Sequence, residues 1–155
     1  MRSTLRGRLI KGEENDEFAV RIGTETLPDQ LKLDLNSGKI KKIVVIGQGT
    51  AAVAAGAIAT AISSQLSEAE MTVKSKPATE LSAFDLVSDM SNTLVIAISQ
   101  SGTTTDTNRT VELVRARGAK VIAIVNRRNS DLTDRADGVL YTSDGRDIEM
   151  SVAST

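Results

Sequence analysis

A segment rich in small hydroxyl residues carries the residue types best suited to binding an anion. An unbroken apolar run at residues 94–98, typical of a strand buried on both faces of a parallel sheet, precedes it. Apolar residues at helical spacing follow from Val111. Between the two lie Ser99, Ser101, Thr103, Thr104, Thr105 and Thr107. A helix N-terminus offers unpaired N–H groups and the positive end of a dipole, so the pattern predicts a phosphate-binding loop.

A simpler interpretation is that these hydroxyl residues only cap the helix that follows. One hydroxyl is enough for a cap, whereas this loop carries several. No acidic residue occurs in the loop before Asp106, which leaves it uncharged. We therefore favour the phosphate interpretation.

Composition narrows the function classes. The 155 residues suit one domain with its own core. The 19 basic and 20 acidic residues nearly cancel and aromatic residues make up 2%, which argues against nucleic-acid or membrane surfaces as partners. Cysteine and histidine are absent, so we expect no thiolate or histidine metal site, no cofactor and no cysteine nucleophile. Without a signal-peptide core or a membrane-spanning run, a cytoplasmic protein is expected.

Strands and helices are predicted to alternate along the chain. Strands are predicted at residues 41–46, 71–76, 94–98, 121–125 and 139–142. Three helices are predicted at residues 29–35, 79–87 and 132–136, and the beginning of another at 148–155. Two more are predicted to follow the loops: one runs from the glycine-rich loop to about residue 66, and the other from the hydroxyl loop to residue 117.

This alternation indicates an α/β fold with three layers, αβα, around a five-stranded parallel sheet in the flavodoxin-like order 2-1-3-4-5. Residues 1–40 are interpreted as an N-terminal lead-in or linker that packs on the domain. Residues 41–155 are interpreted as the binding domain, truncated in its last helix.

In that strand order the loops after strands one and three, residues 47–51 and 99–104, flank the crevice where such sheets bind ligands. The first loop also fits G-x-G-x-x-A, a dinucleotide fingerprint that needs an acidic residue at the end of strand two. Lys74 and Lys76 stand there instead. Because a lysine can hold a 2′-phosphate, nucleotide binding stays as an alternative. Gly47 and Gly49 are also expected to let the helix pack closely on the strand.

Two segments resemble the signatures of a known family. Residues 99–107 read SQSGTTTDT and residues 149–155 read EMSVAST. They are similar to the SQSGxTxDT and ExxVAST motifs of the SIS (sugar isomerase) phosphosugar-binding domains. Within that family the chain looks most like the first SIS domain of the glutamine–fructose-6-phosphate aminotransferases (glucosamine-6-phosphate synthases), and residues 2–8 look like the segment that precedes it.

The resemblance implies roles for individual residues. The residues implied in phosphate binding are Ser99, Gln100 through its backbone, Ser101 and Thr104. The residues implied in sugar binding are Gly49, Thr50, Val152 and Ser154. This chain departs from the family at Gln48, Ala51 and Thr103, which stand where cysteine, serine and glutamate are usual. Without the serine hydroxyl at Ala51, one sugar contact is lost.

The resemblance implies a homodimeric protein that binds a hexose phosphate, fructose 6-phosphate or glucose 6-phosphate, as the first isomerase half of an aminotransferase. In the family the isomerisation base lies in the second SIS domain and the C-terminal tail. Asp106 and Glu149 are each expected in the first turn of a helix, where a carboxylate favours the dipole. We therefore expect no catalytic residue in this chain and binding without turnover. Two alternatives remain: a non-catalytic phosphosugar-sensing module, and a purely structural dimerisation module.

Overall fold

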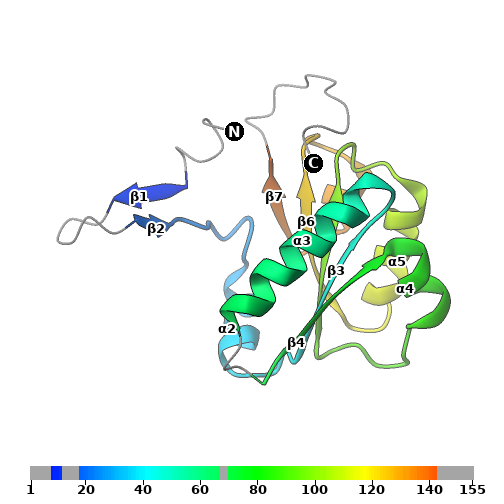
Figure 1. Cartoon of the computed structure of the whole chain (residues 1–155), viewed down its shortest axis with the longest axis horizontal. Helices are drawn as coiled ribbons and strands as arrows, with labels where there is room; N and C mark the ends of the chain where they lie inside the picture. Colours follow the sequence, from blue (N-terminus) through cyan, green and yellow to red (C-terminus); the bar gives the residue numbers. More distant parts are fainter. Residues whose placement is uncertain (1–7, 12–17, 67–69, 143–155) are drawn as a thin grey trace.

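A five-stranded parallel sheet organises the fold (Figure 1). The computed structural model describes residues 8–11, 18–66 and 70–142. The strands of the sheet are β3 (Lys42–Gly47), β4 (Thr72–Pro77), β5 (Thr93–Ser99), β6 (Lys120–Val125) and β7 (Gly138–Tyr141). They lie in the order β4-β3-β5-β6-β7, which confirms the predicted order 2-1-3-4-5.

Strand β5 is the centre of the sheet. All seven of its residues are buried, because it is flanked by β3 and β6 and covered on both faces. The apolar run that predicted this strand is therefore explained by its position. The outer strand β4 is mostly exposed, in keeping with its weaker apolar pattern and its lysines.

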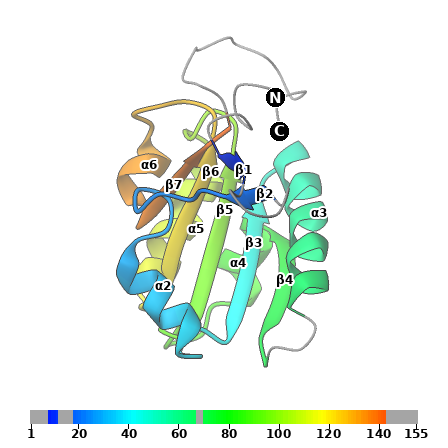
Figure 2. The same cartoon turned by 90° about the vertical axis from the view of Figure 1, so that its left-hand side faces the viewer.

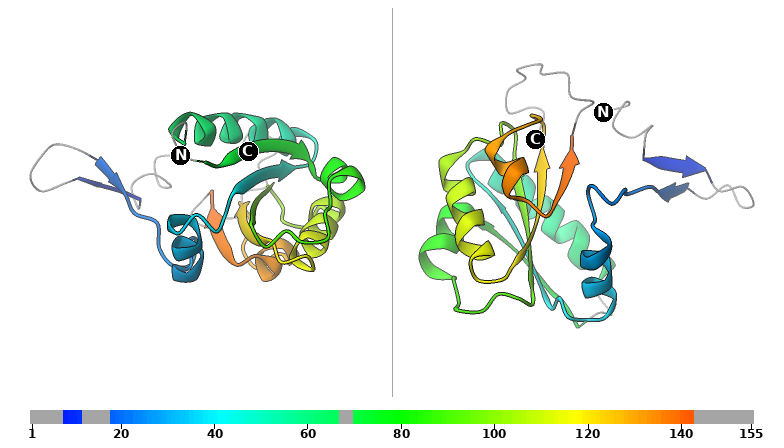
Figure 3. Two further views of the ribbon diagram at one scale, coloured as in Figure 1. Left: turned by 90° about the horizontal axis from the view of Figure 1, so that it is seen from below. Right: turned by 180° about the vertical axis from the view of Figure 1, so that it is seen from behind.

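Helices cover both faces of the sheet, which confirms the three-layer prediction (Figures 2 and 3). Buried residues of α2 (Asp29–Asn36) and α3 (Thr50–Gln65) pack in one cluster with Ile43, Val45 and Ile96. The other cluster joins α4 (Ala78–Phe84), α5 (Thr105–Arg115) and α6 (Asp131–Arg135) to the opposite face. No helix in the described part of the chain is long and apolar enough to cross a membrane.

Helix α4 ends at Phe84, before the predicted end at residue 87. The apolar Leu86, which suggested a longer helix, packs on the core from a non-helical segment. Burial of Leu86 therefore does not require helical backbone at that position.

The first part of the chain forms an antiparallel hairpin that the sequence did not predict. Strands β1 (Leu9–Lys11) and β2 (Phe18–Val20) pair with each other and extend away from the central sheet (Figure 1). The segment after β2 pairs with the edge strand β7. The backbone N–H of Val139 donates to the Glu25 carbonyl, and the Thr26 hydroxyl donates to the Val139 carbonyl, each at 2.8 Å. Residues 25–26 thus cover part of the outer edge of β7.

A buried carboxylate joins helix α2 to the start of the sheet. Asp34 is 4% exposed and accepts hydrogen bonds from Gln30 Nε2 at 2.9 Å and from Lys39 Nζ at 3.0 Å. The bond from Gln30, followed by the bond from Lys39, lowers the pKa of Asp34. The folded state therefore favours the ionised carboxylate.

We predict that Asp34→Asn lowers the free energy of unfolding near neutral pH and matters progressively less in acid. A carboxyl whose pKa is depressed on folding adds stability above its unfolded pKa of about 3.9. This contribution disappears as the pH falls through the lower, folded value. Urea unfolding at neutral pH and below about pH 3 measures the difference. Lys39→Met should reproduce part of the same pH dependence, whereas an equal effect of Asp34→Asn at both pH values would contradict it.

Candidate functional site

A pocket of about 200 Å³ opens at the carboxyl end of the sheet, where β3 and β5 end. It is lined by Gln48, Thr50, Ala51, Ile98, Ser99, Gln100, Ser101 and Thr104. The two loops, 47–51 and 99–104, therefore converge on one cavity. The prediction that they meet is confirmed.

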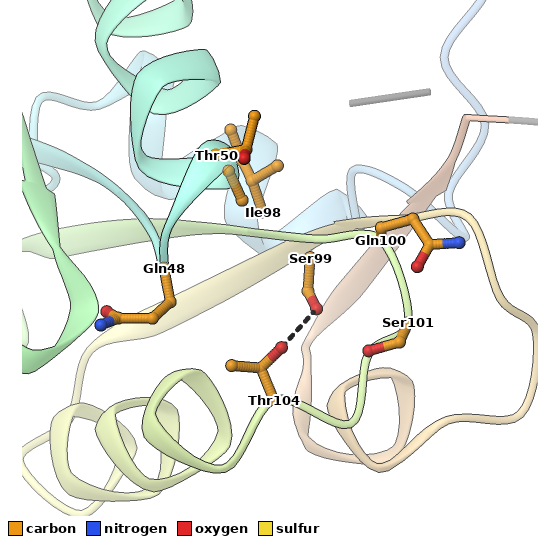
Figure 4. A pocket seen from close by; sticks show the side chains of 8 residues that line it. Gln48, Thr50, Ile98, Ser99, Gln100, Ser101 and Thr104 are labelled. Carbon is orange, nitrogen blue, oxygen red and sulfur yellow. Dashed lines mark hydrogen bonds between the residues drawn. The ribbon is translucent and has the colours of Figure 1, made fainter. Parts of the chain in front are cut away.

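Three hydroxyl side chains gather on the β5 side of this pocket (Figure 4). Ser99 Oγ accepts a hydrogen bond from the Gly102 N–H at 3.0 Å and lies 3.5 Å from Thr104 Oγ1. Ser101 Oγ accepts from the Thr103 backbone N–H at 3.2 Å and from Thr103 Oγ1 at 3.0 Å. Both serine oxygens accept a bond from a backbone N–H of the loop. This leaves the Ser101 proton, and one of the two protons of the Ser99–Thr104 pair, to be donated to a ligand.

Two helices begin beside the pocket. Helix α3 starts at Thr50 and α5 at Thr105, and neither has a side-chain hydrogen bond at its cap. The N–H groups of a helix's first turn have no partner within the helix, and they carry the positive end of its dipole. All residues that line the pocket are uncharged. The site therefore offers hydrogen-bond donors and dipoles to an anion without a fixed charge.

Gly102 is required by the shape of the hydroxyl loop. Its φ is +67°, and a Cβ at this position would lie 2.0 Å from Ser130 Oγ. The Gly102 carbonyl also accepts a hydrogen bond from the Leu132 N–H at 3.0 Å, which ties the loop to the start of α6. The loop is therefore held in a backbone conformation that only glycine fits.

The two glycines of the first loop have different roles. A Cβ on Gly47 would lie 2.5 Å from the Ala51 carbonyl, so Gly47 permits the close approach of α3 to β3. The prediction that Gly49 also lets the helix pack closely on the strand is wrong, because nothing lies within 4 Å of its Cβ position. Gly49 instead adopts φ 60° and ψ −127° to turn the chain into α3.

The lysines of strand two give no support to the dinucleotide alternative. Neither Lys74 nor Lys76 lines the pocket. Lys76 Nζ pairs with the Asp85 carboxylate instead. Within the described ranges, no group of three or more acidic side chains is placed to hold a metal ion.

The structure places five of the predicted site residues in the pocket: Thr50, Ser99, Gln100, Ser101 and Thr104. Gly49 is exposed beside the pocket at the start of α3 and does not line it. Val152 and Ser154 lie outside the described residues.

Sequence reasoning missed Ile98, which supplies an apolar wall. Its place directly before Ser99 at the end of the apolar run was the available signal. Gln48 also lines the pocket, but its side chain points away from the three hydroxyls (Figure 4).

Comparisons with known proteins identify the family of this chain. The model of the SIS domain family matches residues 38–155. The chain is 37% identical over 158 residues to the glutamine–fructose-6-phosphate aminotransferase (isomerizing) of Corynebacterium glutamicum, matching all of this chain and 22% of that protein. This chain therefore spans about a fifth of that relative's length.

Solved structures share the fold. The C-terminal domain of glucosamine-fructose-6-phosphate aminotransferase from Francisella tularensis superposes with a TM-score of 0.59 at 23% identity, over 77% of this chain and 33% of that one. Glucosamine-6-phosphate deaminase from Thermotoga maritima gives a TM-score of 0.57 at 23% identity, over 76% of this chain and 38% of that one.

We predict that Gly102→Ala destabilises the protein by about 2–4 kcal/mol, because a strained backbone and a steric overlap with Ser130 add together. Gly38→Ala is the matched control, since Gly38 has φ +71° but nothing within 4 Å of its Cβ position. It should cost only about 1–2 kcal/mol. Urea unfolding of both variants measures the difference, and equal losses would show that Ser130 does not constrain the loop.

Proposed function

Since the chain belongs to the SIS domain family, we propose that the pocket between β3 and β5 binds the phosphate group of a hexose phosphate. The observation that carries the proposal is the convergence of three hydroxyl groups and two helix starts on one uncharged cavity. Such a cavity suits a ligand that brings its own negative charge and accepts many hydrogen bonds.

In this proposal the loop after β5 holds the phosphate. Ser99, Ser101 and Thr104 donate their hydroxyl protons to its oxygens, and Gln100 donates through its backbone N–H. The first turn of α5 adds the favourable end of its dipole. Hydrogen bonds to an ionised acceptor are about twice as strong as neutral ones, so this loop supplies most of the binding free energy.

The loop after β3 faces the sugar. Thr50 stands across the pocket from the hydroxyls of the other loop (Figure 4). Gly49 is proposed to contact the sugar through its backbone, and Val152 and Ser154 are proposed to close the far side. Ala51 lines the pocket without a hydroxyl, which leaves this chain with one polar sugar contact fewer than its family motif provides.

Fructose 6-phosphate is the proposed ligand, and glucose 6-phosphate is the second candidate. The choice is supported by the 37% identity to a glutamine–fructose-6-phosphate aminotransferase. We propose that the chain serves as the first isomerase half of such an aminotransferase. The homodimer expected from the resemblance stays a prediction, which light scattering on the purified chain would test.

The pocket as described is built for binding. Aldose–ketose isomerisation moves a proton between adjacent carbons and needs a base close to the sugar. No lining residue of the described pocket is ionisable near neutral pH. The same observation favours a second candidate function, a non-catalytic module that senses a phosphosugar for a partner.

We predict that Ser101→Ala combined with Thr104→Ala weakens binding of fructose 6-phosphate by roughly 2–4 kcal/mol, at about 1–2 kcal/mol for each charge-assisted bond. Titration calorimetry measures the affinity. The control is Thr60→Ala with Ser64→Ala, which removes two hydroxyls from the exposed side of α3 and should leave the affinity unchanged. Unchanged affinity in the Ser101/Thr104 variant would remove the phosphate assignment.

We also predict that the chain by itself does not interconvert fructose 6-phosphate and glucose 6-phosphate, because its described pocket offers no base. A coupled assay for glucose 6-phosphate, run on the chain that binds in calorimetry, measures this. Turnover by the unmodified chain that is lost in the Ser101/Thr104 variant would show that the pocket itself is catalytic. That result would refute both the aminotransferase-half and the sensor proposals in their present form.

A further inference from the structure

Asn108 lies beneath the hydroxyl loop, in the first turn of α5, and is 7% exposed. Its side-chain Nδ2 donates to the Gly102 carbonyl at 3.0 Å and to the Thr104 carbonyl at 3.1 Å. Its backbone N–H also donates to the Thr104 carbonyl, at 3.0 Å. One side-chain amide therefore bridges the two carbonyls on either side of Thr103.

These bonds fix the part of the loop that carries Thr104. The Gly102 carbonyl is held from a second direction by the Leu132 N–H at 3.0 Å. The Gly102 N–H in turn donates to Ser99 Oγ, so the hydroxyl of Ser99 is oriented by the same peptide segment. Asn108 is thereby connected through the backbone to two of the hydroxyls that face the pocket.

The orientation of the Asn108 amide follows from its surroundings. Rotating the amide by half a turn would place Oδ1 against two carbonyl oxygens, which repel it. In the observed orientation Oδ1 is buried and has no hydrogen-bond partner among the described residues. A buried acceptor without a partner lowers stability, so stability alone does not account for an asparagine at this position.

We propose that Asn108 is a positioning residue of the phosphate site: its Nδ2 holds the Gly102 and Thr104 carbonyls so that the Ser99 and Thr104 hydroxyls are arranged before the ligand binds. The inference rests on the proposed phosphosugar binding. A loop that is ordered in advance loses less entropy when the ligand arrives, and this raises the affinity.

Thr110 is the matched control for a purely structural role. It lies on the same helix, is 0% exposed, and its Oγ1 lies 2.9 Å from the Ala78 carbonyl and 2.8 Å from the Asp106 carbonyl, which share its one proton. It is therefore a buried hydrogen-bond donor, like Asn108, but it joins α5 to α4 and to its own first turn rather than to the hydroxyl loop.

The experiment compares Asn108→Leu, which keeps the branched shape and removes the donors, with Thr110→Val. Calorimetric titration with fructose 6-phosphate gives the Kd, and thermal unfolding gives the Tm. We expect Asn108→Leu to raise the Kd by about tenfold, the size of one or two lost hydrogen bonds. Thr110→Val should lower the Tm and leave the Kd within about twofold, because its hydrogen bonds do not reach the loop.

Asn108→Asp adds a readout that a structural role would not move. The variant has nearly the same shape, but at neutral pH its carboxylate faces two carbonyl oxygens and lies close to the bound phosphate. We expect the Kd to rise about a hundredfold near neutral pH. The ratio of its Kd to that of the unmodified protein should shrink as the pH is lowered toward about 5, because the protonated acid regains one donor.

The outcomes separate this inference from the proposed function. If the unmodified chain binds neither fructose 6-phosphate nor glucose 6-phosphate, the proposed function fails and takes the inference with it. If the unmodified chain binds and Asn108→Leu binds equally well, only the inference fails. Equal losses of affinity in Asn108→Leu and Thr110→Val, or a Kd ratio for Asn108→Asp that does not change with pH, would likewise overturn it.

Discussion

The direct parallel pairing of β3 with β5 is the constraint on which the site depends. The register aligns Ile46 of β3 with Ala97 of β5, so both strands finish at the same edge of the sheet. The chain then enters α3 on one face and α5 on the other, and this leaves the two loops facing each other across the pocket. Any other neighbour for β3 on that side would separate Thr50 from Ser101 and remove the cavity.

Within the pocket, anion binding is assigned to neutral groups. The loop's own N–H groups donate to the Ser99 and Ser101 hydroxyl oxygens and leave the Ser101 proton available, while Ser99 and Thr104 share one bond between their hydroxyls. Two residues keep this arrangement in place. Gly102 packs closely against Ser130, and Asn108 donates hydrogen bonds to two loop carbonyls. Donors that are already oriented need no rearrangement when a ligand arrives, and a lysine or arginine in their place would be more mobile.

The groups that line the pocket suit the binding of a ligand rather than a reaction on it. The described pocket presents donors on one side, Ile98 as an apolar wall and Thr50 on the other, with no ionisable group among its lining residues. The chain spans about a fifth of the length of its relative from Corynebacterium glutamicum. The proposed binding role needs only the groups that the described pocket provides.

The sequence by itself determined the sheet, its strand order and the meeting of the two loops at one edge. These features follow from local signals: apolar runs such as 94–98 specify buried strands, and the strand order brings the loops that follow β3 and β5 together. The resemblance at residues 99–107 then identified the family, which the match over residues 38–155 confirmed.

Only the tertiary structure decided the details that depend on residues far apart in the chain. Strands β1 and β2 have three residues each and the side chains of β2 are exposed, so no burial in a core marks their pairing in the sequence. The contact of Gly102 with Ser130 joins different loops. No sequence pattern indicates that the Asn108 amide lies against the Gly102 and Thr104 carbonyls. Periodicity reports which face of an element is buried, but it carries no information about which polar atoms meet there.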